Sequence, residues 1–206
     1  MIRSGLPSGS NPAYQFYDHE GEEIIYNHVL DQLTEADVVL FGEQHDHAVV
    51  HLLQYEMTRD LFRTRNGNLI LGAEMFEADN QLILNEYLSG IIKHEHLVTE
   101  AKIWGNYDTD YRPLVEFAKE HGLRFIATNI PRRYANLVAR KGTEALESLS
   151  EEAKRYMAPL PIKVDLATPG YRDMIEVGIG HGAHMNAENF VAAQAVKDAT
   201  MAHFIM

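Results

Sequence analysis

The chain contains no cysteine among its 206 residues. This absence excludes a disulfide scaffold, a thiolate metal site and a cysteine nucleophile. The sequence also has no apolar run near the ~18–20 residues needed to span a bilayer. Residues 1–9 lack the apolar stretch of a secretory leader, so we expect no signal peptide within this sequence.

Positive charge is scarce. Lys and Arg number 18 against 30 Asp and Glu, which gives 18 − 30 = −12 with histidine neutral, and no basic block occurs. This balance predicts no nucleic-acid partner and no direct binding to an anionic membrane. The composition, 46% apolar and 23% charged, is typical of a globular protein and argues against disorder of the whole chain.

The length favours one domain. Residues 1–13, rich in glycine, proline and serine, are predicted to be a flexible lead-in, and residues 14–206 a single domain. Within it, 141–172 is acidic and contains three prolines, so we expect a helical excursion with loops. The helical pattern at 187–206 ends without a capping residue, and we expect a C-terminal strand to be missing from this sequence.

Apolar runs at 37–43, 69–76 and 124–129 predict buried strands. Helical periodicity or stop signals predict helices between and after them, at 50–61, 79–89, 94–103, 113–121, from 131 onward and at 187–206. Strands that alternate with helices predict an α/β fold with a mostly parallel central sheet flanked by helices.

Polar residues interrupt or end these strands. Glu43 and His45 are two residues apart, so a continuing strand would place them on one face. Glu74 lies inside an apolar run, and Arg132 and Arg133 follow the third strand. Ligands bind beyond the carboxyl ends of strands in open parallel sheets, so these side chains are predicted to converge on one crevice.

Two interpretations of the acidic residues remain open. A glutamate inside a strand is costly to bury unpaired, so Glu74 either pairs with Arg or His or belongs to a ligand or metal site. Histidines add weaker signals. His47 and His51 have the one-turn spacing of some metal sites, and His181 and His184 lie in a glycine-containing loop.

A second unusual stretch, 104–113, holds Trp104, Tyr107 and Tyr111 just before a helix. The plain interpretation is a loop pinned to the core by its aromatic rings. The alternative is that the two phenols reach the crevice. A phenolate ligates ferric iron, and tyrosinate is an axial ligand of haem iron.

Five segments then occur in an order that resembles one family. They are 39–46 (VLFGEQHD), 72–76 (GAEMF), 104–114 (WGNYDTDYRPL), 129–133 (NIPRR) and 193–202 (AQAVKDATMA). The sequence resembles the ChaN-like haem-binding proteins, which share a superfamily with the TIKI metalloproteases. The resemblance implies an α/β fold and an iron-regulated lipoprotein of the cell envelope that handles haem and dimerises around stacked haems. This chain has no lipid-accepting cysteine, so such an anchor would belong to a longer precursor.

Matched residue by residue, the resemblance implies Tyr111 as the tyrosinate ligand of the haem iron, with Tyr107 as second choice. Arg112, Arg132 and Arg133 are candidates to bind the haem propionates.

The alternative is a TIKI-like metal-dependent hydrolase. There Glu43, His45 and Glu74 would hold a divalent ion, and Arg132 would stabilise the oxyanion. In the third interpretation, these charges only pair with one another.

Overall fold

The computed structural model describes residues 13–180 and 186–206, so the predicted lead-in and the His181 and His184 pair lie outside the described residues, except for Ala13. The fold is α/β, as predicted, with a small parallel sheet flanked by helices. The chain divides into two compact units. Among the described residues, unit 1 comprises 13–70 and 104–124, and unit 2 comprises 71–103, 125–180 and 186–206.

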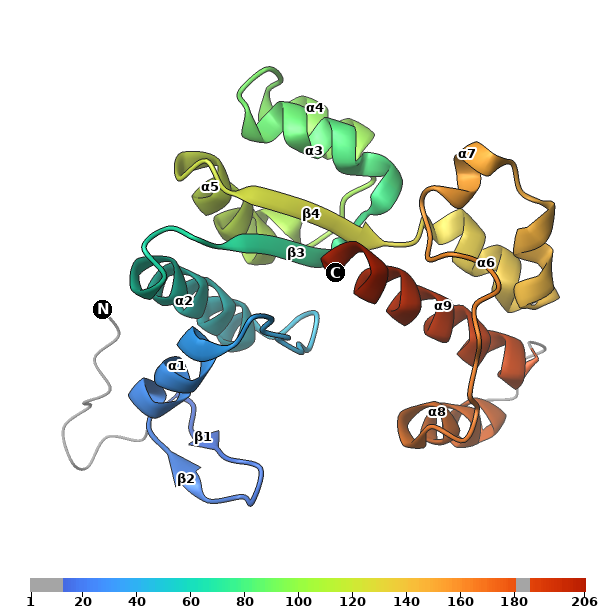
Figure 1. Cartoon of the computed structure of the whole chain (residues 1–206), viewed down its shortest axis with the longest axis horizontal. Coiled ribbons are helices and arrows are strands. Elements are labelled where there is room, and N and C mark those ends of the chain that lie inside the picture. The colour runs from blue at the N-terminus through green and yellow to red at the C-terminus, as the bar shows by residue number, and fades with distance from the viewer. Residues whose placement is uncertain (1–12, 181–185) are drawn as a thin grey trace. The chain divides into compact units, whose positions relative to one another are not determined.

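Unit 1 is built on packed helices. A short antiparallel pair, β1 and β2, precedes helix α1, which packs against the longer α2 (Figure 1). The π-helical turn η2 leads directly into α5, which also packs on α2. The bounds are β1 Phe16–Tyr17, β2 Glu23–Ile24, α1 Tyr26–Glu35, α2 Ala48–Thr64, η2 Tyr107–Tyr111 and α5 Arg112–Glu120.

The core of unit 1 follows from helical spacing. Tyr26 and Leu30 are one turn apart on α1, and Met57 and Leu61 are one turn apart on α2. Residues four positions apart share a helix face, so these two pairs form the buried contact between the helices. The Tyr26 hydroxyl donates to Asp60 at 3.0 Å, which satisfies a buried carboxylate beside this core.

The prediction of a strand at 37–43 is wrong for this structure. The segment forms no strand. Val39 and Phe41 pack against the α1–α2 core, whereas Val38 and Leu40 are 52% and 81% exposed. Only one face of the segment is therefore buried. A continuous apolar run alone cannot distinguish a strand buried on both faces from a loop packed on one.

Unit 2 contains the parallel pair β3 and β4, which lie side by side (Figure 1). The connection between them includes η1 and the helical pair α3 and α4. A side chain at Gly72 of β3 would meet the Thr128 methyl at 3.2 Å, so glycine lets the two strands approach. The bounds are β3 Ile70–Glu77, η1 Ala78–Asn80, α3 Gln81–Leu88, α4 His94–Glu100 and β4 Arg124–Asn129.

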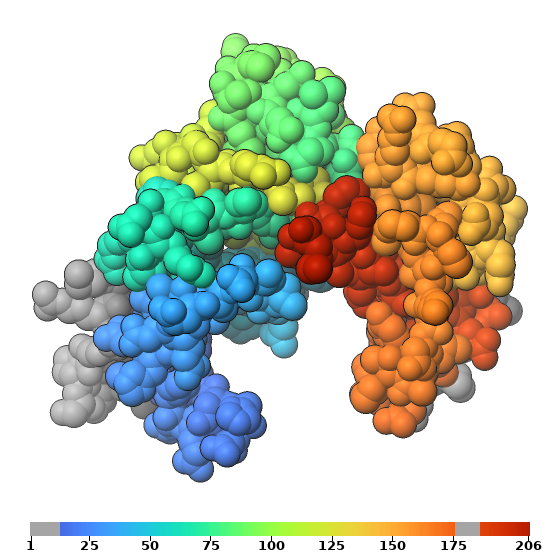
Figure 2. Space-filling model, in the orientation of Figure 1, coloured from blue at the N-terminus to red at the C-terminus, as the bar shows by residue number. Residues whose placement is uncertain are grey.

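The rest of unit 2 packs around α6 and α9, which share a core that includes Ile130, Val138 and Val196. Figure 2 shows the C-terminal end of α9 in red on the viewed face, bordered by orange segments of the same unit. In the described ranges, no helix combines the length and apolarity needed to cross a membrane. The bounds are α6 Arg132–Lys141, η3 Thr143–Ser148, α7 Glu151–Lys154, α8 Pro169–Gly180 and α9 Ala187–Ile205.

Candidate functional site

Glu43 is the centre of a polar cluster in unit 1. Its Oε1 accepts a hydrogen bond from the Tyr111 hydroxyl at 2.5 Å and lies 2.8 Å from His45 Nδ1. Its Oε2 accepts from Gln54 Nε2 at 2.6 Å. The loop before α2, the helix α2 itself and the turn η2 thus each supply a partner to one carboxylate. The structure brings together Glu43, His45 and Tyr111, three of the residues that the sequence singled out.

The hydrogen bonds set the charge of this carboxylate. Burial raises the pKa of Glu43, but hydrogen bonds from Tyr111, His45 and Gln54 outweigh burial and lower this pKa below its ordinary value. Glu43 is therefore ionised at neutral pH. Burial, then the hydrogen bond to Glu43 and its charge, raise the pKa of Tyr111 above the ordinary value for a phenol. In this arrangement Tyr111 is a protonated donor.

His45 is the most accessible member of the cluster, with 56% of its side chain exposed. An ionised carboxylate only accepts hydrogen bonds, so Glu43 holds the proton of His45 on Nδ1 and leaves the Nε2 lone pair unprotonated in the neutral ring. Ligating histidines usually donate their other ring nitrogen to a carboxylate or carbonyl in this way. The Trp104 ring meets the imidazole edge-on at 4.8 Å between ring centroids. His45 is thus a preorganised nitrogen donor beside an aromatic surface.

Sequence reasoning missed how a second layer of polar residues supports this donor. His51 is only 4% exposed, and its Nε2 lies 3.1 Å from the backbone oxygen of His45. Asn106 donates to the same oxygen at 2.6 Å and to Asp110 at 2.8 Å. These contacts fix the backbone of His45. His51 carried a weak metal signal in the sequence, and Asn106 carried none, because its partner lies 61 positions away.

Tyr107 and Arg112, which were also predicted as site residues, lie in unit 1 as well. Tyr107 is buried, with 3% exposed. The Arg112 side chain is 43% exposed and contacts Asp108 at 3.4 Å and Glu116 at 3.3 Å. Exposed ion pairs of this kind contribute little free energy, so Arg112 can exchange these partners for an anionic ligand.

The other predicted site residues belong to unit 2. Arg132 Nε donates to Glu77 at 3.1 Å, and Arg133 Nη1 donates to Asp79 at 2.5 Å. The carboxylate that pairs with Arg132 is therefore Glu77, not Glu74. Glu74 lies within β3, and its backbone oxygen accepts from Asn129 at 3.2 Å. Both arginines thus have acidic partners, but these partners, Glu77 and Asp79, are not among the residues that the sequence singled out.

The predicted metal trio is split between the units, with Glu43 and His45 in unit 1 and Glu74 in unit 2. Across residues 13–180 and 186–206, no group of three or more His, Asp or Glu side chains is placed to hold a metal ion. The divalent-metal alternative thus has no support in the described part of the chain.

Comparisons with known proteins agree with the fold. A family model described as "Haem-binding uptake, Tiki superfamily, ChaN" matches residues 29–206. Among solved structures, the chain is similar to one described as "Cofacial heme binding to ChaN of Campylobacter jejuni", with a TM-score of 0.65 and 19% identity. The match covers 90% of this chain and 71% of that one. At this identity the likeness concerns the fold. No curated protein matches the chain.

Proposed function

Because the chain belongs to the ChaN-like haem-binding uptake family of the Tiki superfamily, we propose that it binds haem through the Glu43 cluster of unit 1. The observation that carries this proposal is the pairing of Glu43 with His45 Nδ1 at 2.8 Å. It leaves an exposed imidazole nitrogen that is backed by a carboxylate and lies beside Trp104. Histidine is an established axial ligand of haem iron, so this donor set fits the group.

His45 and Tyr111 differ in their readiness to ligate iron. Tyr111 is 2% exposed, and its hydroxyl is engaged by Glu43. Ligation by a tyrosinate, which the family resemblance implies, requires this phenol to lose its proton next to a carboxylate that opposes the loss. We therefore assign His45 Nε2 as the iron ligand in the arrangement described. Tyr111 is the alternative ligand, and its use requires separation from Glu43.

Haem also carries two propionates, and the net charge of −12 does not attract them. Arg112 is the basic residue within unit 1 that the sequence assigned to this role. Its contacts with Asp108 and Glu116 are long and exposed, so a propionate can compete for the guanidinium.

A haemin titration followed by absorption spectroscopy tests the proposal. The unsubstituted chain should bind haemin saturably. His45→Ala should weaken binding at least about tenfold and change the ferric spectrum, because it removes the nitrogen ligand. The matched control is His47→Ala, which removes an exposed histidine two residues away and should leave binding within about twofold.

Tyr111→Phe separates the two ligands. If His45 ligates the iron, this variant keeps its spectrum and loses only the Glu43 hydrogen bond. Loss of the spectrum in Tyr111→Phe but not in His45→Ala would transfer the ligand to Tyr111. The haem proposal fails if the unsubstituted chain shows no saturable binding.

The cellular role follows from the same family membership. We propose that the protein handles haem or iron in the cell envelope and pairs with a second copy when haem is bound. Fractionation of the source cells tests the location, and gel filtration with and without haemin tests the pairing. Recovery only in the cytoplasm, or a monomer at saturating haemin, would contradict the corresponding part.

A further inference from the structure

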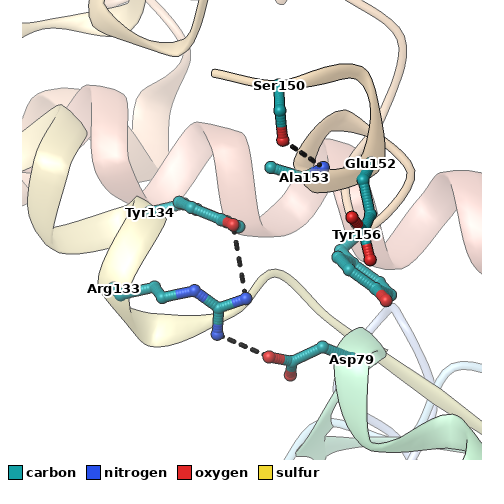
Figure 3. Close-up of a pocket in the computed structure, with 7 residues that line it drawn as sticks. All are labelled: Asp79, Arg133, Tyr134, Ser150, Glu152, Ala153 and Tyr156. Atoms are coloured by element: carbon teal, nitrogen blue, oxygen red, sulfur yellow. Dashed lines mark hydrogen bonds and ion pairs between the residues drawn. The ribbon is translucent and has the colours of Figure 1, made fainter.

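Unit 2 contains a pocket of about 400 Å³ next to the first turn of α6. In Figure 3, Arg133 and Tyr134 stand on one side of it, Glu152 and Tyr156 stand across from them, and Asp79 lies below the guanidinium. Its lining residues are Asp79, Arg133, Tyr134, Ser150, Glu152, Ala153 and Tyr156. The volume is within the range of small-molecule sites in proteins.

The charges that line the pocket do not cancel. The one lining cation, Arg133, is already held by Asp79, at 2.5 Å from Nη1 to Oδ2. Glu152 has no ion-pair partner among the described residues. Asp79 and Glu152 against Arg133 leave a net charge of −1 at the pocket. Anions are therefore disfavoured, and one positive charge would neutralise the lining.

The polar lining also has unused acceptor capacity. The second oxygen of Asp79, Oδ1, is buried and accepts no hydrogen bond within the described ranges, so Arg133 satisfies this carboxylate only in part. Glu152 faces the opening together with the Tyr156 phenol (Figure 3). A donor-rich ligand matches this lining better than an acceptor, because carboxylates can only accept.

Aromatic rings complete the preference for a cation. The Arg133 guanidinium carbon lies 4.4 Å from the centroid of the Tyr134 ring, so one ring of the pocket already contacts a positive group. Tyr156 offers a second ring across the opening, and in the described part of the chain no cation lies over it. A carboxylate beside an uncovered aromatic ring is a common way to hold an ammonium group.

We propose that this pocket binds a small organic monocation of the primary-ammonium class, with its ammonium group at Glu152 and against the Tyr156 ring. The pocket belongs to unit 2, whereas the haem proposal rests on residues of unit 1. Failure of either proposal therefore leaves the other standing.

The test is an NMR titration of the full chain with butylammonium chloride, which follows the backbone amides of residues 150–156. Saturable shifts confined to these residues and the start of α6 are expected. Butan-1-ol has the same alkyl part without the charge and should give no saturable shift. A titration with sodium chloride at the same ionic strength shows which amide shifts come from salt alone. Equal shifts with butanol, or no saturable shift with butylammonium, would overturn the proposal.

Two neighbouring glutamates provide a matched pair of variants. Glu152→Gln should weaken butylammonium binding about fivefold, the scale of an exposed ion pair. Glu151 does not line the pocket and is paired with Lys154 at 3.1 Å. Glu151→Gln removes the same charge from the same helix and should change binding less than twofold. If both variants weaken binding equally, the effect comes from the overall negative charge of this helix, and the proposed contact with Glu152 is wrong.

The last experiment neutralises the net charge of the pocket lining. Asp79→Asn releases Arg133 from its partner and changes the net charge of the lining from −1 to 0. Butylammonium should then bind more weakly, and inorganic phosphate should begin to shift the Arg133 and Tyr134 amides. A thermal melt of the variant shows that it is folded. Saturable phosphate binding to the unsubstituted chain at this pocket would assign it to anions and overturn the proposal.

Discussion

The two units contain the same arrangement of three side chains, used in different settings. In unit 1, the Tyr111 hydroxyl donates to Glu43 at 2.5 Å, and Gln54 donates to the other carboxylate oxygen at 2.6 Å. In unit 2, the Tyr171 hydroxyl donates to Asp198 at 2.6 Å, and Gln194 donates to the other oxygen at 2.8 Å. Each carboxylate is thus satisfied at both oxygens by one phenol and one amide.

The difference lies in what else reaches the carboxylate. Glu43 also contacts His45 at 2.8 Å and lies 3.6 Å from Nδ1 of His51. Asp198 has no histidine partner among the described residues, and its partners join α8 to α9. A carboxylate with one phenol donor and one amide donor stabilises the packing of the elements that carry these residues. The added imidazole, half exposed and oriented by the carboxylate, is what makes the unit 1 version a candidate ligand site.

The largest effect should follow removal of the two carboxylates. Glu43→Gln replaces an acceptor of three donors by an amide, and leaves Tyr111, Gln54 and His45 competing for one oxygen. We expect a loss of about 3 kcal/mol in the free energy of unfolding, against about 1.5 kcal/mol for Asp198→Asn, since hydrogen bonds to charged groups contribute ~1.5–3 kcal/mol each. Urea unfolding of both variants measures the difference. Equal losses would mean that His45 adds nothing to the cluster.

The pH dependence provides a control for this pair. The folded-state pKa of Glu43 is lowered, so its contribution is present above the unfolded pKa of about 4.3 and is lost as pH falls through the folded value. The unsubstituted chain should therefore lose stability on acidification more steeply than Glu43→Gln. If the free energy of unfolding falls equally steeply with acidification in the two proteins, Glu43 is not the ionised group with a lowered pKa that we describe.

Much of the fold is local in origin and was predictable. Gly122, with a φ of +63°, follows the end of α5 and lies two residues before β4, and the apolar runs at 69–76 and 124–129 form β3 and β4. The sequence also placed Glu43 and His45 on one face of a continuing strand, because residues two apart in an extended segment share a face. Their segment is a packed loop instead of a strand, and within it His45 Nδ1 lies 2.8 Å from Glu43 Oε1.

The partners of the cluster could not be predicted in the same way. Tyr111 meets Glu43 across 68 positions, and Arg132 meets Glu77 across 55. Such pairs depend on how packed helices and strands approach one another, and no periodicity in the sequence encodes that approach. The sequence therefore identified Tyr111 as chemically unusual, but could not show that a carboxylate holds it as a neutral phenol.

Both Tyr111 and Tyr171 should lose their protons at higher pH than an ordinary phenol. Burial, then the hydrogen bond to Asp198 and its charge, raise the pKa of Tyr171 to about 12, and the pKa of Tyr111 is raised by the same causes through Glu43. A raised folded pKa gives stability that is present below the unfolded value of about 10 and is lost as pH rises above it. Phenolate absorbance should show one late-titrating group fewer in Tyr111→Phe and in Tyr171→Phe, and each variant should lose about 1.5 kcal/mol at neutral pH. If a variant keeps every late-titrating group, the substituted tyrosine does not have a raised pKa, and the two units differ in this respect.

The two amides should differ by about 1 kcal/mol in what they contribute to stability, and this difference separates an enclosed cluster from a helix-surface pair. Gln194 and Asp198 are one turn apart on α9, a spacing worth about 0.5 kcal/mol, and water can replace the amide when Gln194→Leu removes it. Gln54 instead joins α2 to the loop of Glu43 and lies 3.0 Å from Nδ1 of His51, which is buried. Gln54→Leu removes partners from both groups where water has little access, so we expect a loss of about 1.5 kcal/mol. Thermal melts of the two leucine variants measure the contrast. If Gln54→Leu is as mild as Gln194→Leu, water reaches Glu43 freely, and the enclosure that orients His45 is weaker than the contacts around it indicate.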